Sequence, residues 1–99
     1  LAGDFNAPAG EDGYQHIVWN GEFIDQWHES NPHSFFEPTH LERINGWEHR
    51  RGARRIDYIF KHNRSSLRIN DMRLIFNGYF YPVVSDHFGC LARFQLYTF

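Results

Sequence analysis

Hydrophobic and polar positions alternate most clearly in the stretch RRIDYIFKH. Successive side chains of an extended chain point to opposite faces, so such alternation is typical of a strand with one buried face. The apolar face here is made by Ile56, Tyr58 and Phe60. The opposite face carries Arg55, Asp57 and Ile59. The pattern predicts a strand whose apolar face lies in the core.

Three more stretches predict strands. SLRINDMRLIFNG gives one or two strands and ends at a turn at Gly78. YFYPVV gives a short extended run, which Pro82 confines to a sheet edge or a strand start because proline lacks a backbone N–H. DHFGCLARFQLYTF gives the last strand, with two alternating sets, Leu91, Arg93 and Gln95 against Ala92, Phe94 and Leu96.

Helices are expected to be few and short. One is predicted from about Asp12 to Trp19, after a turn and with acids near its first turn. GEFIDQWHES has apolar residues at helical spacing and predicts a second short helix or turn that stops before Pro32. From Pro32 to Gly52 the chain has little periodicity, which predicts a long loop with room for a short strand around Phe35 to His40. Long loops in compact domains are often functional.

The composition gives the chain more apolar surface than its length can easily bury. Its 99 residues are 41% hydrophobic and include ten Phe, five Tyr and three Trp. A chain this short buries surface less efficiently than a domain of typical size. We therefore expect unusual packing or a missing partner, and self-association through an exposed sheet face. Because the chain starts inside a stretch that reads as a strand, we also expect that it was cut from a longer protein. Its compartment stays open.

Charge and cysteine content narrow the classes of function. The formal charge of −2 gives no overall attraction to nucleic acid or to anionic membranes, although it leaves room for a local basic patch. Cys90 is alone, which excludes an internal disulfide and a cysteine-based zinc site within this chain. No apolar run is long enough to span a bilayer. HRRGARR is usually explained as a solvated loop, but Arg54 and Arg55 could also grip the oxygens of a phosphate ester.

The opening stretch LAGDFNAP has the pattern of a functional strand end. On an extended chain Asp4 and Asn6 point to one side, while Phe5 between them points to the other, where a core can take it. Gly3 allows another backbone or a ligand to come close, and Pro8 forces the chain out of the sheet. The stretch therefore predicts a polar pair at the end of a strand.

Asp57 requires a partner because an unpaired carboxylate inside an apolar strand is costly. One interpretation is a salt bridge with Arg54 or Arg55, which are near in sequence. The other is a histidine whose tautomer and orientation the carboxylate fixes. His87, in a short SDH loop before the last strand, is the candidate for that role.

The remaining histidines give no such signal. His40, His49 and His62 are expected in loops or at strand ends, where metal ligands can also lie. None shows a spacing typical of metal ligands, so we assign them no role. The SDH tripeptide is also weak by itself, because a loop can carry Asp86 and His87 merely as capping and solvated residues.

Taken in order, GDFN (Gly3 to Asn6), RIDYIF (Arg55 to Phe60) and SDHFG (Ser85 to Gly89) resemble the endonuclease/exonuclease/phosphatase superfamily, the metal-dependent phosphoesterases related to DNase I. The resemblance runs from Leu1 to about Leu96. It implies that residues 1–99 are the C-terminal half of one such domain. The implied fold is α+β, half of a four-layer α/β sandwich, with mixed and mostly antiparallel sheets and short helices on one face.

The resemblance also implies roles for five polar residues that would converge at one edge of the sandwich. Asp4 and Asn6 would position or activate the attacking water and hold the phosphate. His87, oriented by Asp57, would bind a phosphoryl oxygen or act as a base. Asp86 would help to bind the metal, with Asp4 as a further ligand. Oxygen-rich ligands favour Mg²⁺ or Mn²⁺ over zinc, and the group that takes the water's proton stays open.

Parts of the family's site would lie outside this chain. The N-terminal half of the family's domain supplies an Asn, a metal-binding Glu and a second His, so we expect a phosphoesterase as the parent protein and little or no activity from the chain alone. Its substrate is open among phosphodiesters and phosphomonoesters, including nucleic acid, which the charge does not favour. Two alternatives are an inactive binding module on the same fold and a small α+β domain in which Asp57 pairs with Arg.

Overall fold

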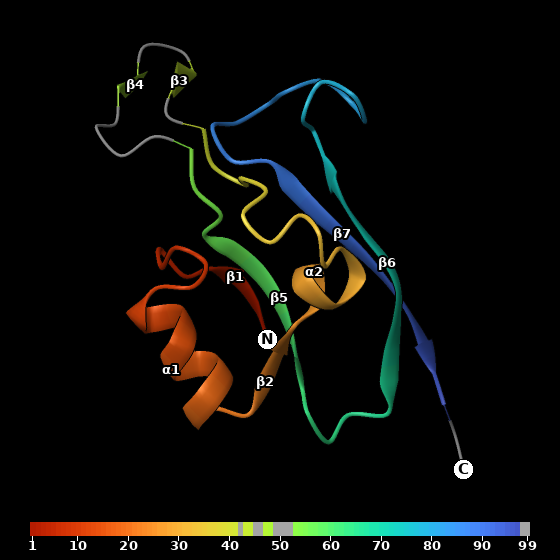
Figure 1. Ribbon diagram of the computed structural model, residues 1–99. Helices are drawn as coiled ribbons and strands as arrows, with labels where there is room; N and C mark the ends of the chain where they lie inside the picture. Colours follow the sequence, from red (N-terminus) through yellow and green to blue (C-terminus); the bar gives the residue numbers. More distant parts are fainter. Residues whose placement is uncertain (42, 45–46, 49–52, 98–99) are drawn as a thin grey trace.

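The computed structural model describes residues 1–41, 43–44, 47–48 and 53–97 (Figure 1). The strands and helices in these residues follow in the order β1 (Ala2–Asp4), α1 (Asp12–Asn20), β2 (Phe23–Asp25), α2 (Gln26–Ser30), β3 (Arg43–Ile44), β4 (Trp47–Glu48), β5 (Asp57–His62), β6 (Leu67–Ile75) and β7 (Gly89–Leu96). The strands and α1 that the sequence pattern predicts around Asp4, Asp12, Asp57 and Leu91 are therefore confirmed.

The strands in the described part of the chain form three small antiparallel sheets. β5 is the centre of a three-stranded sheet in the order β1-β5-β2, where β1 pairs with its first half and β2 with its second half. β6 and β7 form a long hairpin with an irregularity between Ile69 and Asp71. β3 pairs with β4. Antiparallel sheets with two short helices make this an α+β fold, as expected.

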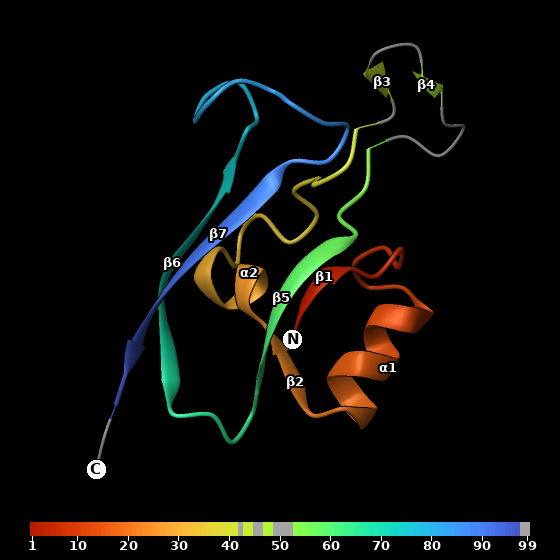
Figure 2. The same ribbon diagram turned by 180° about the vertical axis from the view of Figure 1, so that it is seen from behind.

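β5 separates two hydrophobic clusters because its side chains alternate between two covered faces. Tyr58 and Phe60 lie in the first, called here the aromatic cluster, against α1. Ile59 packs against the second, called here the hairpin cluster, which contains Trp27 of α2 and Met72 of β6. Both views show α1 on one side of β5 and α2 between β5 and the β6–β7 hairpin (Figures 1 and 2).

Three sequence-based expectations are wrong in detail. Phe23–Asp25 is a strand rather than part of a helix, because its backbone pairs with β5, and the helix begins only at Gln26. The stretch around Phe35 to His40 forms no strand, and His40 alone makes isolated bridges. The YFYPVV stretch forms no strand: residues 79–81 are bends and residues 82–84 are irregular, after a turn in which Gly78 has a φ of +91°.

The molecule is elongated and exposes many apolar side chains. Its extents are 51 × 31 × 22 Å and its accessible surface is 6856 Å², whereas a compact monomer of this mass has about 5,900 Å². Tyr79 is 91% exposed and Trp19 75% exposed. Among the described residues no helix has both the length and the apolar character needed to cross a membrane.

Candidate active site

His87 and Asp57 form a hydrogen-bonded pair where the start of β5 meets the loop that leads into β7. Nδ1 of His87 lies 2.9 Å from Oδ2 of Asp57. An ionised carboxylate can only accept, so Nδ1 carries the proton and Nε2 is the ring atom left for other chemistry. Of the two partners that the sequence allowed for Asp57, the structure therefore has the histidine. Neither Arg54 nor Arg55 pairs with Asp57 in the described part of the chain.

Thr39 holds the Asp57 carboxylate in place. Its Oγ1 donates to Oδ2 of Asp57 at 2.7 Å and accepts from the backbone N–H groups of Ile56 and Asp57, each at 3.1 Å. Thr39 is fully buried, so no water competes for these bonds. Sequence reasoning missed this residue, because a threonine in a loop without periodicity gives no signal.

Asp4 faces Asp57 across the sheet. The two residues are register partners in the β1–β5 pair, so their side chains lie on the same face. Oδ2 of Asp4 lies 3.9 Å from Nε2 of His87. Two carboxylates directly opposite each other repel, and a cationic imidazole or a metal ion between them offsets this repulsion. His87 thus lies between two acids, one on each ring nitrogen.

Asn6 does not share a strand face with Asp4 as the sequence suggested. β1 ends at Asp4, and Asn6 has a φ of 49°, in the left-handed region that asparagine tolerates. Its backbone N–H donates to Oδ1 of Asp4 at 2.8 Å, which orients that carboxylate. The Asn6 side chain is exposed and makes no hydrogen bond to the described residues. The structure therefore brings Asn6 near the site through its backbone.

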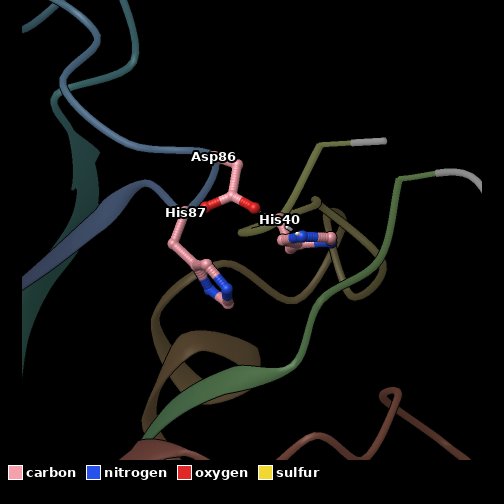
Figure 3. Close-up of side chains that lie close together, drawn as sticks. All are labelled: His40, Asp86 and His87. Carbon is pink, nitrogen blue, oxygen red and sulfur yellow. Dashed lines mark hydrogen bonds and ion pairs between the residues drawn. The ribbon is translucent and has the colours of Figure 1, made fainter. Parts of the chain in front are cut away.

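Asp86 and His40 form a second acid–imidazole pair beside the first. Nε2 of His40 lies 3.3 Å from Oδ2 of Asp86, and the His40 and His87 rings are 4.6 Å apart between centroids. In Figure 3 the Asp86 carboxylate points toward His40. Partial desolvation raises the pKa of Asp86, but the His40 hydrogen bond and the two neighbouring imidazoles outweigh it, so its pKa lies below the usual value.

His40 is a site residue that the sequence did not reveal. It is only 4% exposed and bridges through its backbone to both Arg54 and His87. These contacts join segments 14 and 47 residues away along the chain, so no local spacing could have indicated them. The bridges also explain how a loop residue is held with enough precision to contact the SDH loop.

The cluster has the ligands to hold a divalent cation. Two groups each offer three ligand atoms within 4.8 Å of one another, one made by His40, Asp86 and His87 and the other by Asp4, Asp57 and His87. The two metal ligands expected from the sequence, Asp4 and Asp86, therefore fall in separate groups that share His87. Mixed carboxylate and imidazole ligands suit divalent metals of intermediate softness as well as hard cations.

The two candidate phosphate-binding arginines have different environments. The Arg55 side chain is 1% exposed, its guanidinium lies 2.7 Å from Oδ2 of Asp25, and it lies over the Phe35 ring at 4.9 Å. It stabilises the core, and this placement corrects the phosphate role expected for it, because no surface is left for a ligand. Arg54 lies across the backbone bridge from His40, and its Nε has no hydrogen-bond partner among the described residues.

Antiparallel sheets, short helices and an Asp–His pair at the end of the central strand define an α+β fold of the DNase I type. The chain is similar to a solved structure, an endonuclease/exonuclease/phosphatase family protein from Leptotrichia buccalis C-1013-b, with 28% sequence identity and a TM-score of 0.72. The match covers 97% of this chain and 36% of that chain. It supports the superfamily to which the three sequence motifs point. No protein-family model and no curated protein sequence matches the chain.

Proposed function

We propose that this chain is the C-terminal half of a phosphoesterase domain that depends on a divalent metal, Mg²⁺ or Mn²⁺, and hydrolyses a phosphodiester or phosphomonoester. The observation that carries the proposal is the position of His87 between Asp57 on Nδ1 and Asp4 near Nε2. The likeness to the family protein from Leptotrichia buccalis supports a hydrolase as the parent. The chain spans 36% of that protein, which agrees with a partial domain.

The residues of this chain can do the proton chemistry that phosphoester hydrolysis needs. Asp57 fixes the His87 ring, so that Nε2 can donate a hydrogen bond to a phosphoryl oxygen or take a proton. Asp4, held by the Asn6 backbone, lies on the same side and can orient or deprotonate the attacking water. Oδ2 of Asp4 and Nε2 of His87 therefore face the same space. Attack on one phosphorus atom requires such an arrangement.

A divalent ion fits the two three-residue groups that share His87. When bound, such an ion would neutralise the negative charge that develops on the phosphoryl oxygens during hydrolysis. Asp86 suits the role of ligand, because its carboxylate belongs to one of these groups and an aspartate is ionised at neutral pH. Arg54, which is partly exposed, remains a candidate for contacting the phosphate.

The missing half would complete both the fold and the site. The excess accessible surface and the exposed aromatic side chains are what a domain cut in two would show. We expect the chain alone to be inactive and to pair with the rest of its own domain.

The test is hydrolysis of a generic phosphodiester with Mn²⁺ by three proteins: the longer parent, the parent with His87→Ala, and the 99-residue chain. We expect an active parent, a loss of about 10²–10⁴-fold in the variant, and no activity from the chain. His62→Ala in the parent is the matched control, because this partly exposed histidine lies at the far end of β5. Efficient turnover by the short chain would contradict the half-domain proposal. A parent inactive with every divalent metal would favour the binding module.

A further inference from the structure

A basic groove lies at the opposite end of β5 from the candidate active site. It has a volume of about 610 Å³ and is lined by Lys61, Arg64, Ser65, Ser66, Arg68 and Tyr97, among others. Arg64, Ser65 and Ser66 belong to the turn between β5 and β6, at the bottom of Figure 1, and Lys61 and Arg68 lie on the strands on either side of it. At about 3.3 Å per residue, the last residue of β5 lies about 17 Å from Asp57. The groove is therefore separate from the candidate active site.

Positive charge is concentrated in the groove. Residues 61–68 include three cations and no carboxylate, in a chain whose formal charge is −2. Among the described residues none of the three forms an ion pair, whereas Arg55, Arg73 and Arg93 each contact an aspartate. Glu29 is the carboxylate that lines the groove, and its Oε2 accepts a hydrogen bond from Gln26 at 3.1 Å.

Several of these groups are already held in position. Nζ of Lys61 donates to the backbone oxygen of Leu67 at 3.0 Å, which fixes the ammonium at the turn and leaves two of its protons for other acceptors. The Arg68 guanidinium lies over the Tyr97 ring at 4.7 Å. Such a contact orients the planar group while its N–H donors stay available. The groove therefore has donors that lose little freedom when a ligand binds.

We propose that this groove binds an anionic ligand that carries two or more phosphate groups. Guanidinium forks, an ammonium and serine hydroxyls are the donors that phosphate oxygens accept from. The volume exceeds what one phosphate ion fills, and the three cations come from positions 61, 64 and 68, so adjacent phosphates can be contacted together. Free polyphosphates and the backbone of a nucleic acid strand share this chemistry. The proposal is independent of the proposed hydrolase activity.

The test is a titration of the purified protein that contains residues 1–99 with inorganic pyrophosphate and, separately, with an octamer of thymidylate. Binding is measured by calorimetry, and the amide resonances of residues 61–68 are followed by NMR. We expect both probes, or pyrophosphate alone, to shift these resonances at 150 mM salt. Pyrophosphate alone would identify terminal phosphates as the ligand, and the octamer would identify internal phosphodiesters. If neither probe shifts them, the proposal is wrong.

Three variants test whether the groove itself is responsible. Arg64→Gln should weaken binding at least about fivefold, and Ser66→Asp, which adds a carboxylate while leaving the Arg68–Tyr97 contact, should weaken it at least about tenfold. Arg93→Gln is the control, since it removes the same charge from a residue paired with Asp71 outside the groove. An equal loss in Arg93→Gln and Arg64→Gln would mean diffuse electrostatic attraction, and would overturn a defined site.

Discussion

His87 and Thr39 share one acceptor atom, Oδ2 of Asp57, which lies 2.9 Å from His87 Nδ1 and 2.7 Å from Thr39 Oγ1. The Asp57 carboxylate thus links a buried backbone-anchored hydroxyl to an imidazole that is partly open to solvent. Such a chain of hydrogen bonds fixes the His87 ring through Nδ1 and leaves its Nε2 atom available. Substitutions of Asp57 and of Thr39 can therefore separate an effect on hydrolysis from an effect on the free energy of unfolding.

Asp57→Asn in the parent protein should reduce hydrolysis by about 10²–10⁴-fold while leaving the fold intact. The amide is close in shape, and its oxygen at the shared acceptor position can still accept from Thr39 and His87, but it carries no negative charge to stabilise the imidazolium. Turnover of a phosphodiester with Mn²⁺, compared at equal circular dichroism, is the measurement. Activity near that of the unchanged parent would remove His87 from proton transfer.

Thr39→Val should destabilise the fold by about 2–3 kcal/mol, because the backbone N–H groups of Ile56 and Asp57 lose their acceptor and the Asp57 carboxylate loses one of its two donors. Thr39→Ser is the matched control, since it keeps the hydroxyl and removes only a methyl group. Urea unfolding gives the free energy of unfolding for both. If the valine and serine variants are equally stable, the hydroxyl is not what holds Asp57.

Arg55→Met should cost about 3–5 kcal/mol, because it leaves the buried Asp25 carboxylate without its cation. Asp25 also accepts from the Tyr14 hydroxyl at 2.8 Å, so Asp25→Asn alone should be damaging too. The double variant should lose clearly less free energy of unfolding than the sum of the losses in the two single variants, because both members of the ion pair are removed together. Strict additivity in urea unfolding would show that the two groups do not interact.

Cys90 should react slowly with thiol reagents in the folded protein. Burial, with a smaller contribution from the negative charge of Asp57, raises the pKa of its thiol to about 11. Since the thiolate is the reactive form, the fraction present at pH 8 falls about 100-fold relative to an ordinary cysteine. Alkylation by iodoacetamide, followed by mass spectrometry, should accelerate as pH rises toward 11 and on unfolding in urea. Labelling at the rate of a free cysteine at pH 8 would contradict this.

The isolated chain should self-associate. On the half-domain proposal, its exposed aromatic side chains, including Trp19 and Tyr79, would be covered by the rest of the domain. Sedimentation equilibrium should show an average mass that rises with concentration, and adding the N-terminal half should reverse the rise. A single monomer mass at all concentrations would count against the exposed apolar surface being an interface.

The sequence predicted those strands whose apolar and polar residues alternate within a single stretch of the chain. Ile56, Tyr58 and Phe60 alternate, and β5 follows from that alone. Phe23–Asp25 was misread, because helical spacing in so short a stretch is outweighed by backbone pairing with β5. The pairing is a tertiary contact, and no residue within the stretch encodes it.

The residues of the candidate site divide in the same way, into those that a local sequence pattern indicates and those that only tertiary contacts place there. Asp4, Asp57, Asp86 and His87 were found because they stand inside or beside strands, where polar residues are conspicuous. The contributions of Thr39 and His40 come from loop backbone bridged to distant segments. The turn at Asn6 depends on a positive φ that composition does not reveal. Arg55 was misjudged because a run of arginines gives no sign that one of them is buried against Asp25.

The two covered faces of β5 make the aromatic cluster a determinant of the candidate active site. A slip of one residue between β5 and β1 would exchange the faces, turning Asp57 into the aromatic cluster and Tyr58 toward His87. The packing of Tyr58 and Phe60 excludes that alternative. A substitution in this cluster can therefore displace Asp57 from His87 without changing either residue, so the placement of the candidate site limits the tolerance of this core to mutation.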